Sequence, residues 1–273
     1  MRNRITITLR EDIIKEADKL VNNLTIRSRS HAIEYLLSKT IANYKINSAL
    51  ILAGGPAGNF TNSTHKCMQN VKGKPILENI VLFLKNQGIE NFVFLCDNMS
   101  NQVTNYFLDG SKLGVSIKYI VTEDSKGPAA AIRMAKNFFD KTFLVWYGDT
   151  LCKIDLADMI RVHNDNKALV TIALTTVSNP LDYGTVRMRG SRITDFFEKP
   201  KKNIAESYLV SAGIFLAEPE IFNNINSKMK SLELDLFPKL AKKNLLLGYP
   251  FEGVWLNVNN KNELQKANIL WEK

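Results

Sequence analysis

The pattern of apolar and polar residues changes character near residue 46. Residues 4–9 alternate with a period of two, which predicts a one-sided β-strand. Two segments with apolar residues at helical spacing follow, the first from Glu11 and the second from Ser30, its predicted N-cap. Residues 1–46 bury little core alone, and a single strand has no hydrogen-bonding partner. The pattern therefore predicts a dimer in which two such strands pair antiparallel.

That pairing would put Arg4, Thr6 and Thr8 of both copies on one exposed ribbon. A two-stranded ribbon fits the major groove of DNA, where such side chains reach base edges. Residues 1–46 also hold nine Lys and Arg against five Asp and Glu, which favours a polyanionic partner. The pattern is therefore typical of a DNA-binding segment, and the alternative is an oligomerisation arm with a solvated polar face.

Residues 4–9 and 28–33 together resemble the ribbon-helix-helix DNA-binding family. The resemblance implies a domain over residues 1–46 that forms a homodimer on double-stranded DNA. It implies base contacts from Arg4, Thr6 and Thr8, and a phosphate clamp where the second helix begins, at Ser28, Arg29 and Ser30.

From residue 47 onwards, apolar runs alternate with amphipathic segments. Strands are predicted over 49–52, 92–95, 116–120 and 142–146, and helices over 76–86, 99–108 and 127–138. The second half has more β character, with strands over 168–175, 184–189, 192–197, 208–216 and 255–258 and a closing helix over 261–273. This order predicts an α/β domain whose mostly parallel sheet is covered on both faces.

Candidate chemistry falls where these strands end. The first strand runs into Gly54-Gly55, where backbone N–H groups can approach an anion, and Lys66 follows. A later strand ends at Asp149. Because ligands bind at the carboxyl ends of parallel strands, we expect Asp149 beside the phosphate cradle, as a ligand for Mg²⁺. The alternative is that Asp149 only caps the following turn.

Composition narrows the class of protein. The 273 residues carry a net charge of +9, which modestly favours a polyanionic partner. Three Cys and three His are widely spaced, so we expect reduced thiols and no metal cluster built from them. No apolar run reaches membrane-spanning length and the first residues lack a signal-peptide core, so the expected location is the cytoplasm.

The large domain resembles the sugar-1-phosphate nucleotidyltransferases, which join an NTP to a sugar phosphate and release pyrophosphate. The matching motifs occur in the family's order and are residues 52–55, Lys66, 73–75, Glu123 with 127–131, 148–149, 183–184, 198–200, 212–213 and 255–256. The resemblance implies a Rossmann-like α/β/α fold with a mixed sheet over residues 47–273. It implies catalytic roles for Lys66, Asp149 and Lys199, ligand binding by Gly54, Gly55, Glu123, Gly127, Gly184, Glu198, Ser211 and Gly213, and a metal site at Asp149 and Asn257.

Two departures from that family bear on catalysis. The family's Gly-Thr-Arg arginine falls on Asn59 or, with one insertion, on Phe60, and no arginine lies between Gly55 and Lys66. At the position of the family's second metal-binding Asp this sequence has Asn257, whose neutral side chain weakens any Mg²⁺ site. Losing one preorganised charged group typically costs about 10²–10³ in rate. Arg133 and Arg187 are the candidates for a replacement arginine.

The sequence thus predicts a DNA-binding transcriptional regulator. Its transferase-like domain would bind a nucleotide, sugar phosphate or nucleotide sugar with little or no turnover. One alternative is an active sugar-1-phosphate nucleotidyltransferase that carries a DNA-binding arm. Another is a scaffold in which the large domain only mediates assembly.

Overall fold

The chain divides into two compact units, Met1–Lys45 and Ile46–Lys273. The computed structural model describes residues 5–22, 25–43, 45–54, 60, 64–97, 101–122, 127–201 and 207–272, with only the backbone described over 38–43. Within the described ranges, no helix has both the length and the apolar character needed to cross a bilayer.

The N-terminal unit contains the two helices that the sequence predicts, α1 (Glu11–Lys19) and α2 (Arg29–Asn43). They pack through a small core of Ala17, Ile26 and Ala32. The predicted N-cap is wrong by two residues. The Ser28 hydroxyl accepts a hydrogen bond from the His31 backbone N–H at 3.2 Å, so the helix has already begun when the chain reaches Ser30.

The strand predicted over residues 4–9 is not formed in the single chain. Residues 5–9 carry no strand pairing, and Arg4 lies outside the described residues. A strand needs a partner for its backbone groups, and in the predicted ribbon that partner is a second chain. Thr6 and Thr8 are exposed, as expected, but so are Ile5 and Ile7. The ribbon therefore stays a prediction.

The large unit is built on one sheet with the order β5-β4-β1-β6-β11-β8-β12-β10-β9. Its strands are β1 (Ser48–Leu52), β4 (Asn91–Asp97), β5 (Ser116–Thr122), β6 (Phe143–Tyr147), β8 (Val170–Thr176), β9 (Gly184–Arg189), β10 (Arg192–Glu198), β11 (Leu209–Ala217) and β12 (Leu246–Pro250). β5, β4, β1 and β6 run parallel, whereas β11 is antiparallel to both of its neighbours β6 and β8. The predicted mixed sheet is confirmed.

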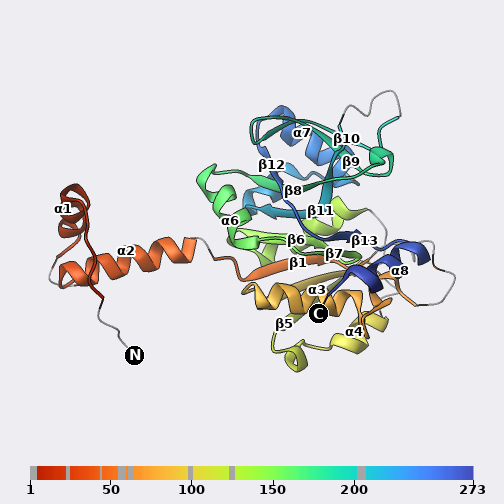
Figure 1. Cartoon of the computed structure of the whole chain (residues 1–273), viewed down its shortest axis with the longest axis horizontal. Helices are drawn as coiled ribbons and strands as arrows, with labels where there is room; N and C mark the ends of the chain where they lie inside the picture. Colours follow the sequence, from red (N-terminus) through yellow and green to blue (C-terminus); the bar gives the residue numbers. More distant parts are fainter. Residues whose placement is uncertain are drawn as a thin grey trace. The chain divides into compact units, whose positions relative to one another are not determined.

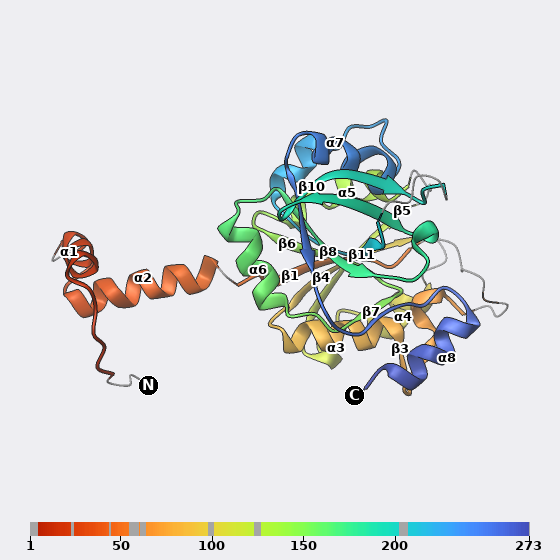
Figure 2. The same ribbon diagram turned by 45° about the horizontal axis from the view of Figure 1, so that its top comes forward.

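Helices cover both faces of this sheet (Figures 1 and 2). Along β1, Ala49 and Ile51 point into one core and Leu50 and Leu52 into the other, as a strand buried on both faces requires. The first core is completed by α3 (Ile76–Asn86), α4 (Asn101–Phe107), α6 (Leu156–Asp165) and α8 (Lys261–Leu270). The second is completed by α5 (Pro128–Met134) and α7 (Phe237–Lys242). The arrangement is the Rossmann-like three-layer fold.

Short elements extend this frame and were largely missed by the sequence analysis. β7 (Thr150–Cys152) pairs with β13 (Trp255–Asn257), and β2 (Asn70–Val71) pairs with β3 (Lys74–Pro75). The strand β12 and the helices α6 and α7 were also not predicted. The β7–β13 ladder matters most, because it brings the end of the chain beside Asp149.

Candidate active site

The carboxyl ends of the central parallel strands form the floor of the site. In register, Leu52 of β1 lies between Leu95 of β4 and Tyr147 of β6. Gly148 follows β6 and donates its backbone N–H to the Leu52 carbonyl at 3.0 Å. A Cβ at Gly148 would lie 2.9 Å from Cys67 Sγ, so only glycine allows this approach. Asp149 is thereby held next to the end of β1, as predicted.

Lys66 and Asp149 form a buried ion pair at this edge. Lys66 Nζ lies 2.8 Å from an Asp149 carboxylate oxygen, and their side chains are 14% and 8% exposed. Burial by itself lowers the pKa of Lys66, but neighbouring carboxylates, Asp149 foremost, reverse this and raise its pKa above the ordinary value. Lys66 is therefore a fixed positive charge, and two of the three residues predicted to be catalytic are in direct contact.

Asn257 lies beside this pair because β13 pairs with β7. Asn257 is opposite Thr150, and the backbone N–H of Val258 donates to the Asp149 carbonyl at 2.9 Å. The Asn257 amide oxygen accepts from the Asn259 side chain at 2.7 Å. Asp149 and Asn257 thus offer one charged and one neutral oxygen ligand, a set that fits a Mg²⁺ ion held otherwise by water and phosphate. Among the described residues, no three His, Cys, Asp or Glu side chains gather as a metal cage.

A second group of acidic and phenolic side chains lies near Asp149, whose charge also acts on Tyr147. Burial first, and then the charge of Glu233, raises the pKa of Glu198 to about 7, while Lys199 opposes this. Tyr147 donates a short hydrogen bond to Glu233, and burial followed by Glu233 raises the pKa of Tyr147 well above its ordinary value. The sequence indicated Glu198 but neither Tyr147 nor Glu233. What distinguishes Glu233 is its hydrogen bond with Tyr147, and nothing in the sequence predicts that contact.

The remaining predicted ligand residues surround this acidic group. Glu198 pairs in register with Gly184, and Lys199 is exposed with a positive φ of 45°. Ser211 accepts from the Gly213 N–H at 3.4 Å, and Gly213 lies against the Tyr147 ring. Gly127, with φ of 86°, lies so close to the Lys230 carbonyl that a Cβ would be 2.1 Å from its oxygen. That contact gives Gly127 a packing reason beyond ligand binding.

Some predicted site residues lie outside the described part of the chain, and others have contacts unrelated to a ligand. Gly55, Asn59 and Glu123 lie outside the described residues, whereas Gly54 is described and packs against Asp97. The alternative arginine position, Phe60, is a buried core residue. Of the two candidate replacement arginines, Arg187 pairs with Asp195 at 3.5 Å and Arg133 is exposed on α5.

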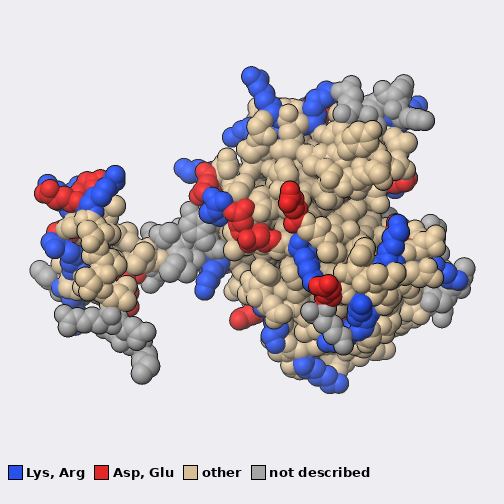
Figure 3. All heavy atoms as spheres, in the orientation of Figure 1, with Lys and Arg blue, Asp and Glu red and all other residues tan. Residues whose placement is uncertain are grey.

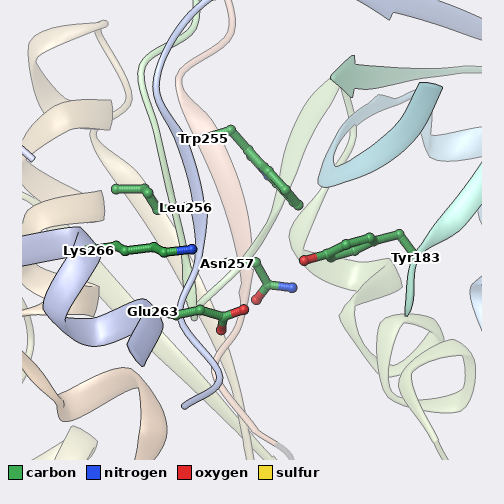
Figure 4. Close-up of a pocket in the computed structure, with 6 residues that line it drawn as sticks. All are labelled: Tyr183, Trp255, Leu256, Asn257, Glu263 and Lys266. Carbon is green, nitrogen blue, oxygen red and sulfur yellow. The ribbon is translucent and has the colours of Figure 1, made fainter. Parts of the chain in front are cut away.

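Next to Asn257 the surface forms a small pocket (Figure 4), lined by Tyr183, Trp255, Leu256, Asn257, Glu263 and Lys266. The Tyr183 and Trp255 rings meet edge to face, with centroids 5.3 Å apart. Trp255 is fixed by a 2.9 Å hydrogen bond from its indole N–H to the Ala212 carbonyl. The pocket adds aromatic surface and one charge of each sign beside Asn257. Tyr183 and Trp255 belong to motifs that the sequence analysis used, but it gave neither a role.

Comparison with known proteins finds similar sequences over most of the chain. The chain is 33% identical over 243 residues to the UTP–glucose-1-phosphate uridylyltransferase of Synechocystis, covering 80% of this chain and 62% of that protein. It is 29% identical over 229 residues to the bifunctional protein GlmU of Methanococcus maripaludis, covering 81% and 53%. The chain thus spans between half and two thirds of the length of these curated relatives.

Solved structures share the fold. The HddC protein of Yersinia pseudotuberculosis, solved in complex with GMP-PN, superposes with a TM-score of 0.71 at 20% identity, covering 82% of this chain and 99% of that one. The family described as nucleotidyl transferase matches residues 48–273. The chain therefore belongs to the nucleotidyl transferase family.

Proposed function

We propose that the large unit transfers a nucleotidyl group from a nucleoside triphosphate to a sugar 1-phosphate. A phosphate oxygen of the sugar 1-phosphate forms a bond to the α-phosphorus, the bond from that phosphorus to the bridging oxygen breaks, and pyrophosphate leaves. The observation that carries the proposal is the buried Lys66–Asp149 pair beside Asn257 at the carboxyl edge of the sheet. The transferase names of the relatives support the same chemistry.

The residues divide the work between the two ends of the site. Lys66 provides positive charge for the nucleotide phosphates, and Lys199 provides it for the sugar phosphate. Glu198 accepts a hydrogen bond from a sugar hydroxyl. Asp149 and Asn257 would hold Mg²⁺, which when bound neutralises charge on the phosphates. The Lys66 ammonium has three N–H donors, so it can donate to a phosphate oxygen while it stays paired with Asp149.

The missing arginine remains the strongest argument for the other interpretation, a regulator whose large unit binds ligand without turnover. The two interpretations differ in one measurement. Full-length protein is incubated with Mg²⁺, each of the four common NTPs and a panel of sugar 1-phosphates, and pyrophosphate release is followed. We expect release with at least one pair and its loss in Asp149→Asn, while Asp140→Asn, at an exposed turn residue, behaves as wild type. No release with any pair overturns the transferase proposal.

For the N-terminal unit we propose dimerisation and binding to double-stranded DNA. The observation that favours this is the exposure of Ile5 (74%) and Ile7 (50%), which alternate with exposed Thr6 and Thr8 as a pairing strand requires. The charge of this unit supports DNA binding less strongly than its sequence suggested. Figure 3 shows acidic and basic side chains mixed on this face of the unit, and Arg29, an expected phosphate ligand, is held by Asp18 at 2.7 Å.

The DNA proposal is tested with full-length protein and a pool of random duplexes. Selection and sequencing should recover a preferred site, and affinity for that site should fall steeply as salt is raised. Sedimentation should give a dimer in the absence of DNA. A protein that stays monomeric and shows no affinity for any duplex leaves the N-terminal unit without this function.

A further inference from the structure

His65, the residue before Lys66, has a buried ring nitrogen without a hydrogen-bond partner. His65 is 6% exposed, and its Nδ1 accepts a hydrogen bond from the Cys67 backbone N–H at 3.3 Å. Its Nε2 has no hydrogen-bond partner, and among the buried side-chain nitrogens and oxygens of the described residues it is alone in this. Buried polar groups in folded proteins are nearly always paired, so such an atom points to a missing partner.

The contact at Nδ1 fixes what that partner must be. Because Nδ1 accepts a hydrogen bond, the proton of the neutral ring lies on Nε2, and Nε2 is a donor. Burial lowers the pKa of His65 and so favours this neutral form near pH 7. The missing partner is therefore a hydrogen-bond acceptor, not a metal ion.

The position of the ring suggests which acceptor it meets. The charges that act on it are those of Asp97, Lys66 and Asp149, in that order. Asp97 ends β4 beside Gly54, and Lys66 and Asp149 form the buried pair. The His65 backbone N–H donates to the Gln102 side chain at 2.9 Å, which holds the residue in place. The unpaired donor thus lies at the same strand edge as the glycine turn and Lys66, where phosphate is expected.

We propose that the Nε2–H of His65 donates a hydrogen bond to a phosphate oxygen of the bound nucleotide and so replaces part of the anion binding that the absent arginine would provide. The inference rests on the proposed transferase function and names one more binding residue in that site. His65 Nε2 is buried, so a phosphate reaches it only when neighbouring side chains move. The Nε2–H donor requires only a phosphate oxygen as its acceptor, so the phosphate of the sugar substrate is the competing acceptor.

Two substitutions separate the donor from the ring's other contact. His65→Asn keeps an acceptor near Nδ1 for the Cys67 N–H but removes the donor. His65→Gln extends an amide N–H to about the position of Nε2. Titration calorimetry on full-length protein uses inorganic tripolyphosphate with Mg²⁺ as the nucleotide probe and glucose 1-phosphate as the sugar probe.

We expect tripolyphosphate to bind His65→Asn about tenfold more weakly than wild type, as for one lost hydrogen bond to a charged group. His65→Gln should recover most of the loss, and glucose 1-phosphate should bind all three proteins alike. His31→Asn, at an exposed residue of the N-terminal unit, is the control and should match wild type.

Other outcomes overturn the assignment. Equal tripolyphosphate affinity in wild type and His65→Asn removes His65 from the site, and a loss confined to glucose 1-phosphate moves the bond to the sugar substrate. Equal losses of tripolyphosphate affinity in His65→Asn and His65→Gln show that binding depends on the packing of the ring and not on hydrogen-bond donation. Binding without pyrophosphate release in wild type overturns the transferase proposal alone, and no binding by wild type overturns both. Should the variants not fold, the ¹⁵N–¹H signal of His65 Nε2 in wild type must still shift on adding tripolyphosphate, and an unmoved signal overturns the proposal.

Discussion

The two units of this chain differ in how far each is complete alone. The large unit has two extensive cores, one on each face of its sheet. Among its described side chains, the N-terminal unit buries only Ala17, Ile26 and Ala32. It nevertheless exposes six large hydrophobic side chains among its described residues, against nine in the much longer large unit; the six are Ile5, Ile7, Ile13, Tyr35, Leu36 and Leu37.

This difference shows where each unit's function must come from. The large unit buries most of its apolar side chains in two cores, so its site follows from charged groups fixed at the strand ends, such as the Lys66–Asp149 pair. The N-terminal unit still has apolar surface to bury, which indicates association with another surface. Changes to charge should therefore impair the activity of the large unit, whereas changes to exposed apolar residues should impair association of the N-terminal unit.

The largest effect is expected from Asp149→Asn in the large unit. The substitution removes the negative charge that pairs with Lys66 and the single charged oxygen ligand proposed for Mg²⁺. We expect pyrophosphate release to fall by about 10²–10³, measured as kcat/KM for the best substrate pair. Dimerisation and DNA binding should be unchanged, and a parallel loss of either would mean that the two units are not independent.

In the N-terminal unit we expect Ile7→Lys to weaken dimerisation by at least about 100-fold. Fully burying an isoleucine contributes about 1.5–3 kcal/mol, and a symmetric dimer loses that contribution twice. Sedimentation across a dilution series measures the change. Thr6→Lys, on the opposite side of the predicted strand, is the matched control and should leave the dimer intact. Equal effects from both substitutions would contradict the predicted strand.

The sequence predicted most of the fold because its longer elements have clear periodicity. The helix over 76–86 was predicted to the residue, since its apolar stripe is uninterrupted. A strand was predicted over β13, but β7 and its pairing with β13 were missed, because a three-residue strand carries almost no period. For the site, Asp149 was indicated by its position after a strand, and Lys66 by its place after the glycine turn and by the family resemblance. His65 and Glu233 were not, since what distinguishes them is an unpaired atom and a neighbouring carboxylate, both properties of the folded chain.

A smaller effect is expected from restoring a carboxylate with Asn257→Asp. Its added negative charge beside Asp149 should strengthen Mg²⁺ binding. We expect pyrophosphate release at limiting Mg²⁺ to rise about tenfold, on the scale of one charged group, with half-saturation at lower metal concentration. Asn262→Asp, exposed in the first turn of α8, is the control for the added charge. A decrease in rate at every Mg²⁺ concentration would show that the amide serves another purpose.

The smallest effect concerns pH at the sugar end of the site. The pKa of Glu198 is raised from 4.5 to about 7, so the folded protein keeps this proton at pH values where the unfolded chain has lost it. Folding stability should therefore fall slightly as pH rises from about 4.5 to 7. Sugar binding should change the other way, because an ionised carboxylate accepts a stronger hydrogen bond from a sugar hydroxyl than a protonated carboxyl group does.

We expect the KM for sugar 1-phosphate to decrease about fivefold between pH 6 and pH 8, as the ionised fraction of Glu198 rises. The substrate's own phosphate titrates in the same range, with a second pKa near 6. Glu198→Gln isolates the protein's share, because it keeps a hydrogen-bonding side chain that does not titrate. The exposed Glu220→Gln should keep the wild-type profile. If Glu198→Gln keeps it too, the pH dependence belongs to the substrate, and the acidic group around Glu233 and Tyr147 has no part in sugar binding.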